Sequence, residues 1–256
     1  MSRLANAPLQ EVIFEVRWDL DRQEGAPLPL DPKFELGLGA FREFLKKDFP
    51  EVVRKYPEQI PVQLLPHAAS WQFRPKSSGW PLLQLGHGVL TVNDTDLAYD
   101  WDTVFFPLVR RALEWLAQAY GESPVFSMAE LRYIDSVRLA DHGFKDWTSF
   151  VGGNLNISVN NEFRPNAKVL DTGLHQVYEL GNGGQVLVAV NSGKRENEDA
   201  MIWQTAVHQA GPFDNNNLLA WAETAHLVSK DLFKEICKPH FYERFTRSRD
   251  TNAAAT

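Results

Sequence analysis

The sequence predicts an α+β fold made of two tandem copies of one unit, each with the order strand, helix, antiparallel meander, helix. Segments 8–18 and 128–139 are both strongly alternating strands. Each is followed by a helical pattern, several short strands and one long amphipathic helix. We therefore expect a first repeat over 1–122, a second over 123–246 and a disordered tail over 247–256. Such a duplication predicts a curved sheet with the helices on one face.

The first strand, expected over 9–18, alternates between charged and apolar side chains. Its apolar positions are Val12, Phe14, Val16 and Trp18. Because successive side chains on a strand point to opposite faces, this set should face the core. The next helix is predicted over 34–45, ending before Pro50, although Gly37 and Gly39 weaken its beginning.

Four short strands separated by turn residues are expected to form the first meander. They cover 62–65, 69–74, 82–85 and 89–93. The helix that closes the repeat is predicted over 101–120, where an apolar stripe recurs at helical spacing. Asp100 or Asp102 is available as its N-cap, and Gly121 should end it.

The second repeat is expected to follow the same order. Its lead strand covers 128–139, and a weak helix follows around 144–151. Further strands are predicted over 167–180, 185–191 and 200–207. The turn Gly181-Asn-Gly-Gly184 joins the first two of these. A long helix over 217–236 closes the repeat and ends near Pro239.

Composition places the chain among globular proteins and disfavours several classes of function. Its 256 residues, of which 44% are hydrophobic, can bury a sizeable core. A net charge of −7 provides no basic field for phosphates, so nucleic-acid binding is disfavoured but stays open. The lone Cys237 cannot form an intrachain disulfide. No apolar run is as long as a membrane span and residues 1–7 lack a signal pattern, so we expect a cytoplasmic protein without membrane association.

Known catalytic and metal-binding signatures are missing from the sequence. There is no Gly-x-Ser-x-Gly, no His-Glu-x-x-His and no paired-cysteine motif, and Ser192-Gly-Lys194 lacks the rest of a Walker loop. The seven histidines are scattered. The acidic run over 94–102 is explained by helix capping. We therefore expect no catalytic residues, no metal and no cofactor, and the sequence favours a protein that is not an enzyme.

One face of the predicted sheet should be open to solvent and polar. If helices cover one side of an antiparallel sheet, alternation places the polar side chains on the other. The candidate binding residues on that face are Glu11, Glu15, Arg17, Arg74, Gln84, Asn93, Glu130, Arg132 and Arg138, and Gln72 shares their parity. These side chains either line a concave groove that binds a partner or form solvated cross-strand ion pairs. The sequence leaves both interpretations open.

Three segments of the chain carry a resemblance to a known family. They are Pro8–Val16, Leu83–Asn93 and Leu131–Asp135. Together they resemble motifs of a sporadically distributed, uncharacterised family of bacterial and archaeal proteins of roughly this length. That family usually has asparagine where this chain has Asp135. The resemblance implies no activity or cofactor, but the patchy distribution implies a defence, immunity or toxin–antitoxin context.

Two classes of function follow from these observations. The favoured one is a non-catalytic recognition protein that binds a macromolecule, in the first place a protein partner, through the polar sheet face. The alternative is a small-ligand-binding or enzymatic domain with a pocket between the long helices and the sheet, and the aromatic content favours it. An enclosed cavity with convergent polar groups would support this alternative, and a filled core would count against it.

Overall fold

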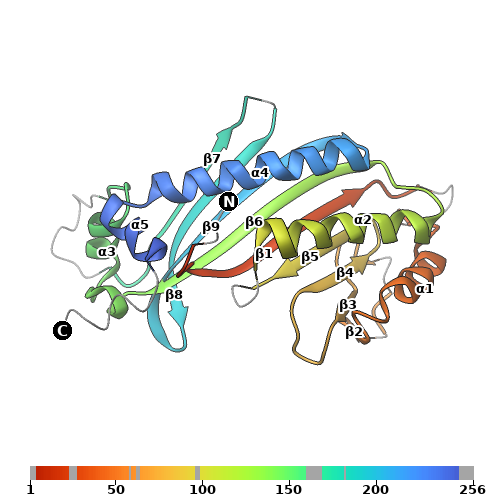
Figure 1. Cartoon of the computed structure of the whole chain (residues 1–256), viewed down its shortest axis with the longest axis horizontal. Coiled ribbons are helices and arrows are strands. Elements are labelled where there is room, and N and C mark those ends of the chain that lie inside the picture. Colours follow the sequence, from red (N-terminus) through yellow and green to blue (C-terminus); the bar gives the residue numbers. More distant parts are fainter. Residues whose placement is uncertain are drawn as a thin grey trace. The chain divides into compact units, whose positions relative to one another are not determined.

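A computed structural model of the chain describes residues 4–22, 28–57, 59–61, 64–95, 99–159, 169–181 and 183–247. The strands are β1 (Leu9–Trp18), β2 (Glu51–Arg54), β3 (Trp71–Arg74), β4 (Leu82–Gly86), β5 (Val89–Asp94), β6 (Phe126–Arg138), β7 (Gly173–Glu179), β8 (Gln185–Arg195) and β9 (Glu198–Phe213). The helices are α1 (Phe34–Leu45), α2 (Phe106–Tyr120), α3 (Trp147–Asn154), α4 (Asn215–Ile236) and α5 (Pro239–Thr246), with a π-helical turn before α2 and a short 3₁₀ turn before α3. Figure 1 traces these elements along the chain.

The fold is α+β, as the sequence predicts. Within the described residues, nine strands form one sheet in the order β2-β3-β4-β5-β1-β6-β9-β8-β7. The strand pairs β1–β5, β2–β3, β3–β4, β4–β5 and β7–β8 are antiparallel. The two predicted lead strands, β1 and β6, are neighbours in this order.

The chain divides into two compact units. Unit 1 lies within 1–11, 132–207 and 225–256, and unit 2 lies within 12–131 and 208–224. The boundaries fall inside β1, β6, β9 and α4, so each of these elements contributes residues to both units. This partition is defined by packing, whereas the predicted repeats at 1–122 and 123–246 are defined by element order. The repeats stay a prediction.

The core of unit 2 forms between one face of its sheet and two helices. The predicted apolar set of β1 is buried, with Val12, Phe14 and Val16 fully so. Strand register aligns Phe14 with Val92 and Val16 with Leu90 on β5, which extends the apolar face across the sheet. Helix α2 lies over these strands, with α1 beside it (Figure 1). This face is therefore closed to solvent, and the polar side chains of the same strands point to the opposite face.

The beginning and end of α2 follow the predicted signals. The Asp100 carboxylate accepts hydrogen bonds from the backbone N–H of Thr103 at 2.8 Å and from its hydroxyl at 2.6 Å. These bonds hold the pKa of Asp100 below its usual value. They cap a π-helical turn, Trp101–Phe105, that leads into α2. Gly121 ends the helix in the left-handed conformation, with a φ of 75°.

The core of unit 1 is a separate cluster of aromatic side chains. Trp203 on β9 stacks on Phe233 of α4, with ring centroids 5.8 Å apart. Phe150 of α3 and Phe241 of α5 meet edge to face at 5.6 Å. Asp146 caps α3 by accepting a hydrogen bond from the backbone N–H of Ser149. Helices of unit 1 thus pack on its strands through a core of their own.

Several predicted elements differ from the structure. Residues 64–65 are not in a strand, and 62–63 lie outside the described residues. Strand β2 was not predicted, because its four residues include two charged ones and give no apolar pattern. Helix α5 was not predicted either, since Pro239 was taken as a stop although proline is favoured at the first helical position. Of the strand predicted over 167–180, residues 167–168 lie outside the described residues, 169–172 are not in a strand, and β7 covers Gly173–Glu179.

The predicted disordered tail falls almost wholly outside the described residues. Of this segment only Arg247 is described, and it pairs with Glu243 of α5 at 2.8 Å. Residues 248–256 are not described. Arg247 therefore belongs to the folded part of the chain.

Candidate functional site

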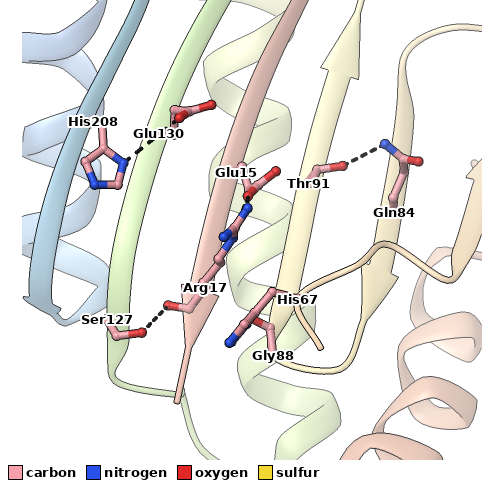
Figure 2. Close-up of polar contacts among 9 residues, drawn as sticks. All are labelled: Glu15, Arg17, His67, Gln84, Gly88, Thr91, Ser127, Glu130 and His208. Atoms are coloured by element: carbon pink, nitrogen blue, oxygen red, sulfur yellow. Dashed lines mark hydrogen bonds and ion pairs between the residues drawn. The ribbon is translucent and has the colours of Figure 1, made fainter. Parts of the chain in front are cut away.

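A row of polar side chains crosses the face of unit 2 that points away from α1 and α2. Register aligns Glu15 of β1 with Thr91 of β5, Thr91 with Gln84 of β4, and Gln84 with Gln72 of β3. Because the neighbouring Phe14 and Val16 face the helices, these four residues face the opposite way. Figure 2 shows Glu15, Thr91 and Gln84 in front of the strands, with a helix behind them. We call these four residues the polar row.

Gln84 is hydrogen-bonded to the members of the polar row on both neighbouring strands. Its amide nitrogen donates to the hydroxyl of Thr91 at 3.0 Å and to Oδ1 of Asn93 at 3.1 Å. Its amide oxygen accepts from Nε2 of Gln72 at 2.8 Å and from Nζ of Lys55 at 3.2 Å. These four bonds use the whole hydrogen-bonding capacity of the side chain. Gln84 is 8% exposed and Thr91 and Asn93 are 4% exposed, so the network is both buried and fixed in one geometry.

Charged side chains of both signs flank this neutral centre. Arg17 forms an ion pair with Glu15 at 2.6 Å, and Ser127 donates a hydrogen bond to the Arg17 carbonyl (Figure 2). Glu130 of β6 lies 4.0 Å from Nδ1 of His208 on β9, a contact that is an ion pair only when the histidine is protonated (Figure 2).

At the β3 end of the polar row, Arg74 contacts Gln72. Arg74 donates to Oε1 of Gln72 at 3.2 Å, and its guanidinium lies 5.5 Å from the ring centre of Trp80. The planar guanidinium can stack on the indole while its N–H groups remain directed at the amide. Its contacts therefore fix Arg74 from two sides.

Neutral polar groups make up the centre of this face. Amides and a hydroxyl do not titrate near neutral pH, and the Glu15 carboxylate is engaged by Arg17. The centre of this face is a closed network of buried polar groups, and its margins carry charges of both signs.

The structure gathers only part of the predicted site. Glu15, Arg17, Arg74, Gln84, Asn93 and Glu130 all belong to unit 2. Glu11, Arg132 and Arg138 belong to unit 1. Their role in binding stays a prediction.

Arg138 illustrates the solvated ion-pair interpretation. It contacts the carboxylates of Asp141 at 2.9 Å, Glu196 at 3.3 Å and Glu198 at 3.5 Å. The hydrogen bond to Asp141 is the main cause that raises the pKa of Arg138 above its usual value. Since these charges already balance the guanidinium locally, we leave Arg138 out of the candidate site.

Three members of the site were not selected from the sequence. Thr91 could have been found, because it has the same parity as Asn93 on a predicted strand. His208 follows the point where the last strand was predicted to end, and the strand in fact continues to Phe213. Lys55 follows β2, which was itself not predicted.

Aromatic side chains pack densely where α1 and the start of α2 meet the sheet of unit 2. Phe34, Phe41, Phe73 and Phe105 are each under 2% exposed, and Phe41 and Phe73 meet edge to face at 5.6 Å. A ligand pocket at this place is therefore disfavoured, and the alternative of a small-ligand site stays open elsewhere in the unit. The aromatic content of this unit is used largely for packing.

Comparisons with family models, curated proteins and solved structures gave no match to this chain. In the part of the chain that the structure describes, no group of three histidine, cysteine or acidic residues is placed to hold a metal ion. None of the described helices combines the length and the apolar character needed to cross a membrane.

Proposed function

We propose that the chain is a non-catalytic recognition protein and that the polar sheet face of unit 2 binds a protein partner. The observation that carries this proposal is the set of partly exposed charges of both signs, Glu15, Arg17, Arg74 and Glu130, that flanks the fixed hydrogen-bond network of Gln84. On a face that is merely solvated, long polar side chains keep their rotamer freedom in water. Here the side chains are already fixed, so binding a partner would cost little further ordering entropy.

The distribution of charge favours a protein over a nucleic acid. Glu15, Arg17, Glu130 and Arg74 alternate in sign around a neutral centre. A surface that binds phosphates collects lysine and arginine and excludes carboxylates. A folded protein presents both signs on its own surface and can match this pattern. The resemblance described above adds a defence, immunity or toxin–antitoxin setting to the proposal.

The proposal includes a tandem origin for the chain. The order strand, helix, meander, helix in β1–α2 is followed by a similar order in β6–α4, which supports a duplication. The predicted curvature of the sheet, with helices on one face, belongs to the same proposal. Its consequence is that one half can diverge toward binding while the other keeps a structural role.

The test exchanges the charges of one ion pair without removing it. In the double variant Glu15→Arg/Arg17→Glu the two side chains can still pair, and the net charge of the chain is unchanged. Partners are captured from an extract of the native host with the tagged full-length chain, identified by mass spectrometry and titrated as purified proteins. We expect the exchange to weaken binding at least about tenfold, because each charge then opposes its match on the partner.

A second ion pair provides the matched control. Glu43 and Lys46 form an exposed pair on α1, and the exchange Glu43→Lys/Lys46→Glu should leave both the affinity and the melting temperature unchanged. The proposal is wrong if the partner binds the Glu15/Arg17 exchange as tightly as the wild type. It is equally wrong if the wild type captures no specific partner.

A further inference from the structure

Unit 2 contains a cleft of about 650 Å³ that plays no part in the proposed function. Its aromatic wall consists of Trp18 and Tyr120, backed by the fully buried Phe126, and its acidic groups are Asp19, Asp21, Asp31 and Glu122. Lys33 also lines it. The described lining thus sets four carboxylates against one ammonium group. We call this feature the acidic cleft.

The aromatic wall is fixed by its own contacts. Trp18 meets Tyr120 edge to face with ring centroids 5.7 Å apart, and it meets Phe126 at 6.3 Å. All three rings are under 9% exposed. Nε1 of Trp18 donates to Asp31 at 3.1 Å, and the Tyr120 hydroxyl donates to the same carboxylate oxygen at 2.9 Å. The wall and the carboxylate therefore form one rigid assembly.

Among the described residues, no lysine ammonium or arginine guanidinium pairs with the buried carboxyl group of Asp31. Asp31 is 8% exposed. Its donors in the described part of the chain are all neutral: the indole of Trp18, the phenol of Tyr120 and, at 3.1 Å, the backbone N–H of Lys33. Burial, followed by the Asp31 charge, raises the pKa of Tyr120 far above its usual value, so the phenol stays protonated and remains a donor.

The lysine that lines the cleft does not neutralise Asp31. Nζ of Lys33 binds Glu122 at 2.5 Å, on the exposed rim. Among the described residues, Oδ1 of Asp31 accepts the backbone N–H of Lys33 alone, and a carboxylate oxygen has room for a second donor. The acidic cleft therefore combines an acceptor oxygen with room for a donor, an excess of acidic side chains and a rigid aromatic wall. These are the three elements that recognise organic cations in proteins.

We propose that the acidic cleft binds an organic cation, namely an alkyl chain that ends in a primary ammonium or guanidinium group. The charged end would donate to Oδ1 of Asp31, and the alkyl chain would pack against Trp18 and Tyr120. The same chemistry is supplied by a free diamine and by a lysine or arginine side chain. The experiment includes both sources.

The test uses the Trp18 indole as a reporter inside the cleft. Its N–H is hydrogen-bonded to Asp31, so the ¹⁵N–¹H cross-peak of this group, assigned with Trp18→Phe, responds directly to a ligand at that carboxylate. The full-length protein is titrated with 1,4-diaminobutane, agmatine, N-acetyl-lysine methylamide and the neutral 1,4-butanediol. We expect saturable shifts with the cations and none with the diol. Raising the salt concentration should weaken the binding of the cations.

Three variants locate the site. Asp31→Asn keeps the shape but removes the charge, and we expect it to lower the affinity at least tenfold. Glu122→Gln alters a side chain on the exposed rim and releases Lys33 to turn toward Asp31, so affinity should fall several-fold with the fold intact. Asp48→Asn removes an exposed carboxylate that pairs with Arg111 elsewhere in unit 2 and should change nothing.

Two results would overturn the proposal. One is the absence of a saturable shift with every cation tested, and the other is an equal shift with the diol. If Asp31→Asn does not fold, the titrations of the wild type and of Glu122→Gln still test whether the acidic cleft binds the cations. Tighter binding of the lysine derivative would identify a basic side chain as the ligand, and tighter binding of the diamines would identify a small molecule.

Discussion

At the scale of single residues, Asp135 is a carboxyl group enclosed in the interior of unit 1. It is 7% exposed, and burial raises its pKa from 3.8 to about 7. Asp135 also acts on Cys237. Burial, followed by the Asp135 charge, raises the pKa of the Cys237 thiol to about 12. An ionised Asp135 is thus disfavoured in the folded state, and the folded protein binds a proton here that the unfolded chain releases.

The change Asp135→Asn should therefore stabilise the protein at neutral and alkaline pH. In the wild type the free energy of unfolding should fall as pH rises from about 4 to about 7 and then level off, with a total loss of up to about 4 kcal/mol. Asparagine carries no charge to desolvate, so the variant should lack this decline and be more stable at pH 8. Urea unfolding at a series of pH values measures the difference.

The control for Asp135 is a carboxylate on the surface of the same unit. Asp199 is about half exposed and pairs with Lys194, so Asp199→Asn should follow the wild-type pH profile closely. If Asp135→Asn is less stable than the wild type at pH 8, the carboxylate has a stabilising partner and the argument from desolvation is wrong.

Parity along a strand predicts which face of the sheet several candidate residues share, and their role in binding stays a prediction. Glu15, Gln84 and Asn93 lie on the polar face where alternation placed them. Parity could not indicate that Gln84 would saturate its hydrogen bonds, because this depends on which strands are neighbours. Parity also could not show that Arg138 is paired with carboxylates of its own unit, because its partners Glu196 and Glu198 lie far away in the sequence.

At the scale of elements, the two glycines of α1 differ in what surrounds them. A Cβ on Gly37 would lie 2.5 Å from Cε2 of Tyr120, whereas a Cβ on Gly39 would meet nothing within 4 Å. Tyr120 cannot move aside easily, because its hydroxyl is bonded to Asp31 and its ring contacts Trp18. Gly37 is therefore required by the packing of α1 on α2, and Gly39 is not.

Alanine at these two positions should have opposite effects on stability. Gly39→Ala should raise the free energy of unfolding by up to about 1 kcal/mol, since alanine is the better helix former. Gly37→Ala gains the same propensity but forces the Tyr120 ring to shift, and we expect a net loss of about 1–3 kcal/mol. Thermal and urea unfolding of the two variants measure both values. If Gly37→Ala stabilised the protein as much as Gly39→Ala, the close approach of Gly37 to Tyr120 would be contradicted.

Element boundaries were predicted best where a local signal exists. Helix α1 spans Phe34–Leu45, which agrees with the predicted stop before Pro50, and Gly121 ends α2. The length of β9, which runs for 16 residues, was underestimated because its last residues, including Pro212, lack strand propensity. Pairing to a neighbouring strand extends an element beyond its local pattern, and the sequence does not reveal that neighbour.

At the scale of the whole molecule, unit 2 is assembled from two distant stretches of chain. Residues 12–131 supply most of it, and 208–224 complete it. Phe126 is fully buried against Trp18, and Gly211 approaches the Phe126 carbonyl so closely that a Cβ would lie 2.1 Å from that oxygen. Phe213 and Trp221 are buried together, with ring centroids 5.9 Å apart. The structural unit therefore does not end at residue 122.

The fragment 1–122 should consequently fail to fold alone. It lacks Phe126, whose loss from a core costs about 3–5 kcal/mol, a large part of the roughly 5–15 kcal/mol that stabilises a domain. It also lacks Phe213 and Trp221. We expect poor dispersion in its amide spectrum and no cooperative melting transition. Joining 12–131 to 208–224 through a flexible glycine-serine linker should restore both, because the linked chain contains every segment of unit 2. A cooperative transition in 1–122 alone would instead show that the first repeat is an independent domain.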